Sequence, residues 1–180
     1  MAITTLNNRS INRSDTASSG QLWTATSATA SDFQSSSAAN TPAFEAVYGG
    51  GTYAISSATY TLAQYGTEIF DSDGEFASHI FTPQTAGKYF LHANAWVYMQ
   101  STAAQSTAMR ILFYKNGSAD NDTETLVGMG DADMQSFSLS TTSIVTANGS
   151  TDNWKVYVKV ATNDATYYNG SFGGFKIIGA

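Results

Sequence analysis

The chain has 180 residues, of which 12% are charged and 13% aromatic, and its formal net charge is −6. This acidity excludes nucleic-acid binding, because that function needs a basic stripe to neutralise phosphates and no such stripe occurs here. The absence of cysteine excludes disulfide bonds and thiolate metal sites. A chain of this length can bury a substantial core. Ten Tyr and ten Phe among many Ser, Thr, Asn and Gly residues are typical of an all-β protein with a polar, uncharged surface.

Residues 1–40 differ in composition from the rest of the chain. Ser, Thr, Ala and Asn occupy 26 of these 40 positions, and the few large apolar residues follow neither helical nor strand periodicity. Such a segment cannot by itself bury enough surface to offset the entropy of ordering it. It is either a flexible leader or an extended N-terminal arm held by a partner, and its isolated apolar residues favour the arm. The candidate docking residues of this arm are Ile3, Leu6, Arg9, Ile11, Arg13 and Trp23.

The charge of the arm is opposite to that of the remaining chain. Arg9 and Arg13, two of only three arginines, flank Ile11 in "LNNRSINRSD" (6–15). Residues 1–14 carry a net charge of +2, whereas residues 41–180 contain six basic and twelve acidic residues. Guanidinium groups pair well with carboxylates and backbone carbonyls. We therefore expect both arginines to contact another protein.

Strand patterns recur after Pro42, separated by Gly-rich, Asp-Gly and Asn-Gly turns. No stretch has the periodicity of a helix. About ten short antiparallel strands within residues 41–180 predict an all-β fold, either a sandwich or a jelly roll. The expected strands are 43–48, 59–65, 67–70, 78–82, 87–99, 107–115, 124–129, 134–146, 153–162, 165–170 and 172–178.

The longest expected strand, "GKYFLHANAWVYM" (87–99), has two apolar faces. Alternation places Tyr89, Leu91, Ala93, Ala95, Val97 and Met99 on the first face, which is the predicted core. The second face carries Phe90, His92, Asn94, Trp96 and Tyr98. Because a free sheet face normally carries Thr, Lys and Glu, the aromatic residues indicate a second buried surface. Either a local loop covers this face or it forms a subunit interface, and the interface is the preferred prediction.

Few residues suggest catalysis or metal binding. His79 and His92 are the only histidines and lie in no metal-binding spacing, and neither a nucleophile elbow nor a phosphate-binding loop occurs. The acidic run "DSDGEF" (71–76) offers oxygen ligands for calcium but lacks the spacing of an EF-hand loop, so a tight turn is preferred. No carboxylate pair for glycoside cleavage stands out among fourteen acidic residues. The sequence predicts a non-enzymatic protein without catalytic residues, metal or cofactor.

Two segments resemble the globular heads of the C1q-like and tumour-necrosis-factor-like jelly rolls. The segment "FTPQTAGKYFLHANAWVYM" (81–99) resembles their Phe-x-x-x-x-x-Gly-x-Tyr-x-Phe/Leu strand, and "SFGGFKII" (171–178) resembles their closing strand. With "YGTEIFDSDGEF" (65–76) and the leader "SINRSDTASSGQLWTATSATASDFQ" (10–34), the chain also resembles short structural proteins encoded by tailed bacteriophages, particularly aquatic ones.

The resemblance implies a jelly-roll sandwich that associates as a homotrimer, with aromatic residues of the long strand near its threefold axis. It makes Tyr89 a core residue and Phe90, Trp96 and Tyr98 candidates for the trimer interface. His92 joins these candidates because it shares their face. The sequence departs from the complement proteins in lacking a Gly-x-y stalk, and the calcium ligands of some relatives have no matching residues here.

The resemblance also implies a place on the virion surface, after synthesis in the cytoplasm of a bacterial host. The preferred function is capsid decoration, in which the arm clamps the major capsid protein. The alternative is the receptor-binding tip of a fibre, seated in a tail or fibre socket and adhering to host surface glycans through Tyr and Asn. A polysaccharide depolymerase is a remote third possibility. The arm favours decoration because it contains neither heptads nor a stalk repeat from which a long fibre is built. The apolar stretches are too short for a signal peptide or membrane insertion.

Overall fold

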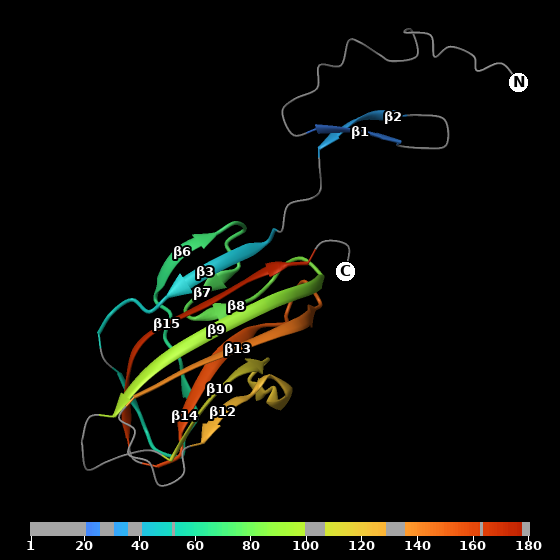
Figure 1. Cartoon of the computed structure of the whole chain (residues 1–180). Coiled ribbons are helices and arrows are strands. Elements are labelled where there is room, and N and C mark those ends of the chain that lie inside the picture. Colours follow the sequence, from blue (N-terminus) through green and yellow to red (C-terminus); the bar gives the residue numbers. More distant parts are fainter. Residues whose placement is uncertain are drawn as a thin grey trace, which may run out of the picture. The chain divides into compact units, whose positions relative to one another are not determined.

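The computed structural model describes residues 21–25, 31–35, 41–51, 53–99, 107–128, 136–162 and 164–177. The chain divides into two compact units, Met1–Ala39 and Asn40–Ala180. The second unit contains the β-sandwich, and its strands make up most of the described chain (Figure 1).

The first unit contains a β-hairpin. Strand β1 (Gln21–Ala25) pairs antiparallel with β2 (Ser31–Ser35), and Trp23 is in register with Phe33. No strand is predicted here from the sequence, because Ser, Thr and Ala surround the few apolar residues and hide the alternation. The candidate docking residue Trp23 therefore lies in a strand. The other five candidates lie outside the described residues: Ile3, Leu6, Arg9, Ile11 and Arg13.

Six antiparallel strands form the first sheet of the sandwich (Figure 1). They are β3 (Ala43–Val47), β4 (Tyr53–Ile55), β6 (Thr67–Asp71), β9 (Gly87–Met99), β13 (Ser136–Ala147) and β15 (Ala165–Lys176). Their order is β13-β9-β15-β3-β6, and β4 pairs with the first residues of β15. Strand β9 pairs with β13 along its whole length and with β15 on its other side. The long two-faced strand is therefore an interior strand of this sheet.

The second sheet has seven strands. They are β5 (Thr61–Leu62), β7 (Phe76–Ala77), β8 (Ile80–Phe81), β10 (Ala108–Lys115), β11 (Ser118–Ala119), β12 (Thr125–Gly128) and β14 (Trp154–Val160). The path runs β11-β10-β14-β8-β7, with β12 on β10 and β5 on β14. The helical content of the described residues is one 3₁₀ turn, Asn121–Thr123. No described helix has the length and apolarity to cross a membrane.

The core lies between the two sheets. The predicted inner face of β9 is confirmed, because its six residues from Tyr89 to Met99 are at most 2% exposed. The second sheet contributes Trp154, Val156, Val158 and Val160 from β14, all fully buried. Rings of the two layers meet directly, as in the stacked pair Phe44 and Phe81, whose centroids lie 4.3 Å apart. Each buried aliphatic or aromatic side chain contributes about 1.5–3 kcal/mol, so the alternating pattern stabilises the sandwich.

Some strands differ from their predicted extents. The expected strands 165–170 and 172–178 are one continuous strand, β15, with a bulge between Tyr167 and Asn169. Glycines inside β15 weaken its sequence pattern, and this is why it reads as two strands. The short strands β4, β7 and β11 are not predicted because two or three residues show no alternation. The expected strands 59–65 and 78–82 shorten to β5 and β8, whereas 87–99 matches β9 at both ends.

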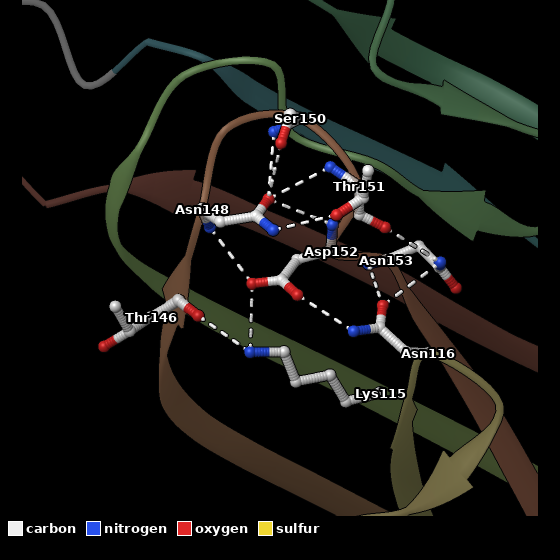
Figure 2. A network of polar contacts seen from close by, with 8 residues as sticks. All are labelled: Lys115, Asn116, Thr146, Asn148, Ser150, Thr151, Asp152 and Asn153. Atoms are coloured by element: carbon white, nitrogen blue, oxygen red, sulfur yellow. Dashed lines mark hydrogen bonds and ion pairs between the residues drawn. The ribbon is translucent and has the colours of Figure 1, made fainter.

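A polar network joins two of the predicted Asn-Gly turns (Figure 2). Its centre is Asp152, which is 9% exposed. The Asp152 carboxylate accepts hydrogen bonds from Asn116 Nδ2 at 2.9 Å and from the Asn148 backbone N–H at 3.0 Å. Lys115 Nζ forms an ion pair with it at 3.0 Å. The turn after β10 is thereby linked to the turn between β13 and β14.

The second turn is organised by its own side chain. Asn148 Oδ1 accepts backbone N–H groups of Ser150 at 3.0 Å, Thr151 at 3.0 Å and Asp152 at 3.1 Å. Asparagine is favoured in turns because its side chain can replace such backbone hydrogen bonds. Its role here is structural, since it orients Asp152 toward Asn116 and Lys115 (Figure 2).

Candidate functional site

The outer face of the six-stranded sheet exposes large apolar side chains. Four of the six exposed large hydrophobic residues in the described chain lie on this face, so the exposure is concentrated rather than scattered: Phe70, Trp96, Ile144 and Phe175. Patches of this kind typically mark interaction sites. We call this surface the aromatic face. The residues that define it are Glu45, Phe70, Phe90, His92, Trp96, Tyr98, Ile144, Tyr168 and Phe175.

One part of the aromatic face is a row across three adjacent strands. Ile144 on β13 is in register with Phe90 on β9, and Phe90 is in register with Phe175 on β15. The centroids of the two phenylalanine rings lie 5.5 Å apart. Ile144 is 63% exposed and Phe175 is 36% exposed. The row therefore presents contiguous apolar surface to a partner.

A second aromatic group surrounds the bulge in β15. Tyr168 lies 5.6 Å from Trp96 and 5.7 Å from Tyr98, measured between ring centroids. Trp96 is 42% exposed. The extra residue of the bulge shifts the alternation of β15, so that the side chain of Tyr168 contacts these outer-face rings while Tyr167 is buried. Strict alternation cannot locate such a residue from the sequence.

A contact between a histidine and a carboxylate lies between these apolar groups. His92 Nε2 on β9 lies 3.1 Å from Glu45 Oε2 on β3, and Gly173 on β15 is in register with both residues. A Cβ atom at Gly173 would lie 1.9 Å from Glu45 Oε2 and 2.6 Å from His92 Nε2. The missing side chain at position 173 thus leaves the space in which the two polar groups meet.

Alanine substitution distinguishes two glycines of β15. We expect Gly173→Ala to displace the flexible carboxylate of Glu45 and to lower the free energy of unfolding by less than about 1 kcal/mol, because the pair is partly exposed. At Gly170 the added Cβ would lie 2.3 Å from the Asn94 backbone oxygen, which cannot move aside. Gly170→Ala should therefore cost about 3 kcal/mol or more. Urea denaturation measures both values, and equal losses would contradict this explanation.

The outer surface of the second sheet has a different chemistry. Arg110 pairs with Glu124, which also accepts a hydrogen bond from Tyr60 Oη at 2.8 Å. Lys159 lies over the Tyr60 ring at 5.0 Å. Charged groups that are paired in this way are compatible with water. The contrast identifies the aromatic face as the surface of the sandwich that favours a partner.

All four predicted interface residues lie on the aromatic face: Phe90, His92, Trp96 and Tyr98. Their participation in a trimer remains a prediction. Sequence reasoning did not single out the members contributed by neighbouring strands. The outward direction of Ile144 and Phe175 can be recognised only after their strands are paired with β9. Glu45 becomes recognisable only through its contact with His92.

The other sequence candidates have structural roles. The acidic run 71–76 forms the predicted turn, in which the Asp71 carboxylate accepts backbone N–H groups from Asp73, Gly74 and Phe76. Within the described ranges, no three His, Asp or Glu residues gather closely enough to hold a metal ion. Glu75 is 6% exposed, and burial raises its pKa above the ordinary value. Its Oε1 accepts the Gln84 backbone N–H at 2.7 Å. Glu75 therefore has a structural role, in which its hydrogen bond holds the loop that contains Gln84.

The two antiparallel sheets define a jelly-roll sandwich, and the predicted fold class is confirmed. No family model and no curated protein sequence matches the chain. The PRD1 vertex protein P5 is a similar solved structure, with 12% identity and a TM-score of 0.51, covering 75% of this chain and 96% of that protein.

Two further solved structures have comparable coverage. Murine APRIL at pH 8.0 is 10% identical with a TM-score of 0.50, covering 75% of this chain and 98% of that one. The globular domain of zebrafish complement 1qA is 16% identical with a TM-score of 0.45, covering 76% and 97% respectively. At these identities the likeness concerns the fold alone.

Proposed function

We propose that the chain is a non-enzymatic structural protein of a tailed-phage virion and that it forms a homotrimer through the aromatic face. The observation that carries this proposal is the concentration of exposed Phe, Trp and Ile side chains on one sheet of a jelly roll. A monomer would leave this apolar surface in water, whereas a partner copy removes it from water. Light scattering tests the oligomer, since a trimer has three times the 19.1 kDa mass of one chain.

The geometry of a cyclic trimer explains why the aromatic face reaches the edge of its sheet. In such a ring each copy presents one surface to its neighbour and a different surface to the other neighbour. Ile144 lies on β13, the terminal strand of the sheet, and continues the apolar row from Phe90 to that edge. Because the apolar row runs to the β13 edge of the sheet, each copy can use its face against one neighbouring copy and its β13 edge against the other.

We propose capsid decoration as the role of the trimer on the virion. Its support is the resemblance of the sequence to phage structural proteins, together with a fold that is also found in a protein named as the PRD1 vertex protein. The N-terminal arm would hold the trimer on the major capsid protein. The fibre-tip alternative places the arm in a tail or fibre socket. No observation on the described residues favours a depolymerase.

Copy number in purified virions separates the two roles. Decoration follows the symmetric lattice of the head, so it requires on the order of hundreds of chains per particle. A fibre tip requires about a dozen. Quantitative mass spectrometry against the major capsid protein gives this number. A value near a dozen would replace decoration by the fibre role.

Removal of the two arm arginines is expected to reduce particle incorporation. Arg9→Ala with Arg13→Ala removes the positive charge of the arm, which we propose to pair with acidic groups or carbonyls of another virion protein. Lys155→Ala with Lys159→Ala removes the same charge from β14 and serves as the matched control. We expect at least about tenfold less incorporation for the arginine variant, corresponding to ~1.4 kcal/mol, with the lysine variant close to wild type. Equal incorporation of both variants would reject the arginine contact.

A further inference from the structure

We infer that a surface hollow around His79 is a binding site for a neutral saccharide. This site is separate from the aromatic face, and the inference does not depend on the proposed trimer. It consists of two hollows, of about 140 and 250 Å³, that share Gly66 and His79 in their walls. We call both together the His79 hollow.

The turn that positions His79 has an unusual backbone. Strands β7 and β8 form a hairpin in which Ala77 pairs with Ile80, so Ser78 and His79 are the two turn residues. Their φ angles are +52° and +68°. A two-residue turn with positive φ at both positions strongly favours Asn-Gly or Gly-Gly. Residues held in such a conformation against their preference occur often at ligand sites.

The imidazole of His79 lacks a hydrogen-bond partner on one side. Its Nδ1 atom is buried and has no partner among the described residues. Buried polar atoms in native proteins are normally hydrogen-bonded, so this exception needs an explanation such as an ordered water. Because Nδ1 has no accessible surface, a ligand in the open hollow would contact the partly exposed remainder of the ring. The ring borders both parts of the hollow, and its Cε1 atom lies close to Gly66. A side chain at position 66 would narrow the hollow beside the ring.

Other polar groups around His79 are also available for a ligand. The side chains of Gln64, Thr67 and Glu68 line the hollow, are exposed, and make no hydrogen bond with the rest of the described chain. Together with His79 they supply both donors and acceptors. A sugar hydroxyl does the same, because each one donates and accepts.

The charge of the lining selects against anions. Among the described residues that border the His79 hollow, Glu68 is the one acidic side chain, and none is Lys or Arg. An acidic sugar or a phosphate would meet like charge there without a cationic partner. Tyr48 and Ala77 add apolar surface that fits the C–H face of a sugar ring. The ligand class that satisfies these conditions is a neutral mono- or disaccharide unit.

Amide chemical-shift mapping on the full chain tests the assignment. We expect maltose, lactose or mannobiose to shift the resonances of residues 48–50, 64–68 and 76–79, with millimolar affinity. Glucuronate, the charged counterpart of a hexose, should bind at least about tenfold more weakly, a difference of ~1.4 kcal/mol. Each neutral sugar is tested at about 50 mM, which is above the range of weak millimolar dissociation constants. If none of them shifts these resonances, the hollow is not a saccharide site and holds ordered water instead. Equal shifts with glucuronate would overturn the ligand class.

Two glycine variants of the same turn separate binding from folding. His79→Gly removes the imidazole and relieves the positive φ, so the melting temperature should stay the same or rise while saccharide affinity falls at least tenfold. Ser78→Gly relieves the neighbouring positive φ but keeps the ring, so it should retain affinity. The role of His79 would be contradicted if both variants kept their saccharide affinity, or if both lost it equally.

Discussion

Glutamate at position 96 or 144 is expected to convert the trimer into a folded monomer. Trp96 is 42% exposed and Ile144 is 63% exposed, so Trp96→Glu and Ile144→Glu disturb little of the core. In the proposed trimer, however, the charge at 144 would be buried beside Phe90 and the charge at 96 beside Tyr168. Losing one buried apolar side chain costs about 1.5–3 kcal/mol per copy. Over three copies this is ~5 kcal/mol or more, at least several thousandfold in the association constant.

Leu126 provides the matched control for this experiment. It is 49% exposed but lies on β12, in the second sheet and away from the aromatic face. Leu126→Glu therefore introduces the same charge in place of a comparably exposed apolar side chain. It should leave the mass of the trimer unchanged. Light scattering and thermal unfolding on all three variants distinguish dissociation from unfolding. The double variant, which combines Trp96→Glu with Ile144→Glu, decides the question. If it is still a folded trimer, the aromatic face is not the interface.

Asp152→Ala is expected to lower the free energy of unfolding by about 3 kcal/mol. The carboxylate is nearly buried and joins Asn116, Asn148 and Lys115, so its removal leaves several polar groups without their partner. The two turns that it links would lose their connection. Asp122→Ala, on the exposed 3₁₀ turn, is the control and should cost less than about 0.5 kcal/mol. Urea denaturation at neutral pH measures both, and similar losses would refute the network as a source of stability.

The same network predicts an acid-sensitive part of the stability. Hydrogen bonding from Asn116 and then from Lys115 holds the pKa of Asp152 below its ordinary value. A carboxyl with a lowered pKa in the folded state stabilises the protein fully above about pH 4, the ordinary range of aspartate. This contribution is lost as the pH falls through the lowered folded-state pKa. The stability difference between wild type and Asp152→Asn should therefore narrow below about pH 4, and a constant difference would contradict the assignment.

The aromatic face shows how far local sequence patterns extend. Alternation over 87–99 correctly divides β9 into a buried face and an outer face, because side-chain direction in a strand depends only on neighbouring positions. Tyr168 is different. A bulge, which depends on pairing with β9, places its ring against Trp96, and no local pattern contains that information.

The His79 hollow depended still more on the fold. From the sequence, His79 is a lone histidine near the start of the expected short strand 78–82. Its positive φ follows from the two-residue hairpin that β7 and β8 impose, and its neighbours Tyr48 and Gln64 come from distant parts of the chain. Sequence spacing does not reveal which side chains of separate strands converge.

The sequence by itself determined that this is an all-β protein, where its central strand runs, which residues of that strand are buried, and that a second apolar face exists. Those properties depend on short-range alternation and on turn residues such as Asn148 and Asp71. The tertiary structure alone decided the His92–Glu45 contact over Gly173, the Asp152 network and the His79 hollow. These sites depend on register and on close approach between segments far apart in the chain, and only strand pairing determines both.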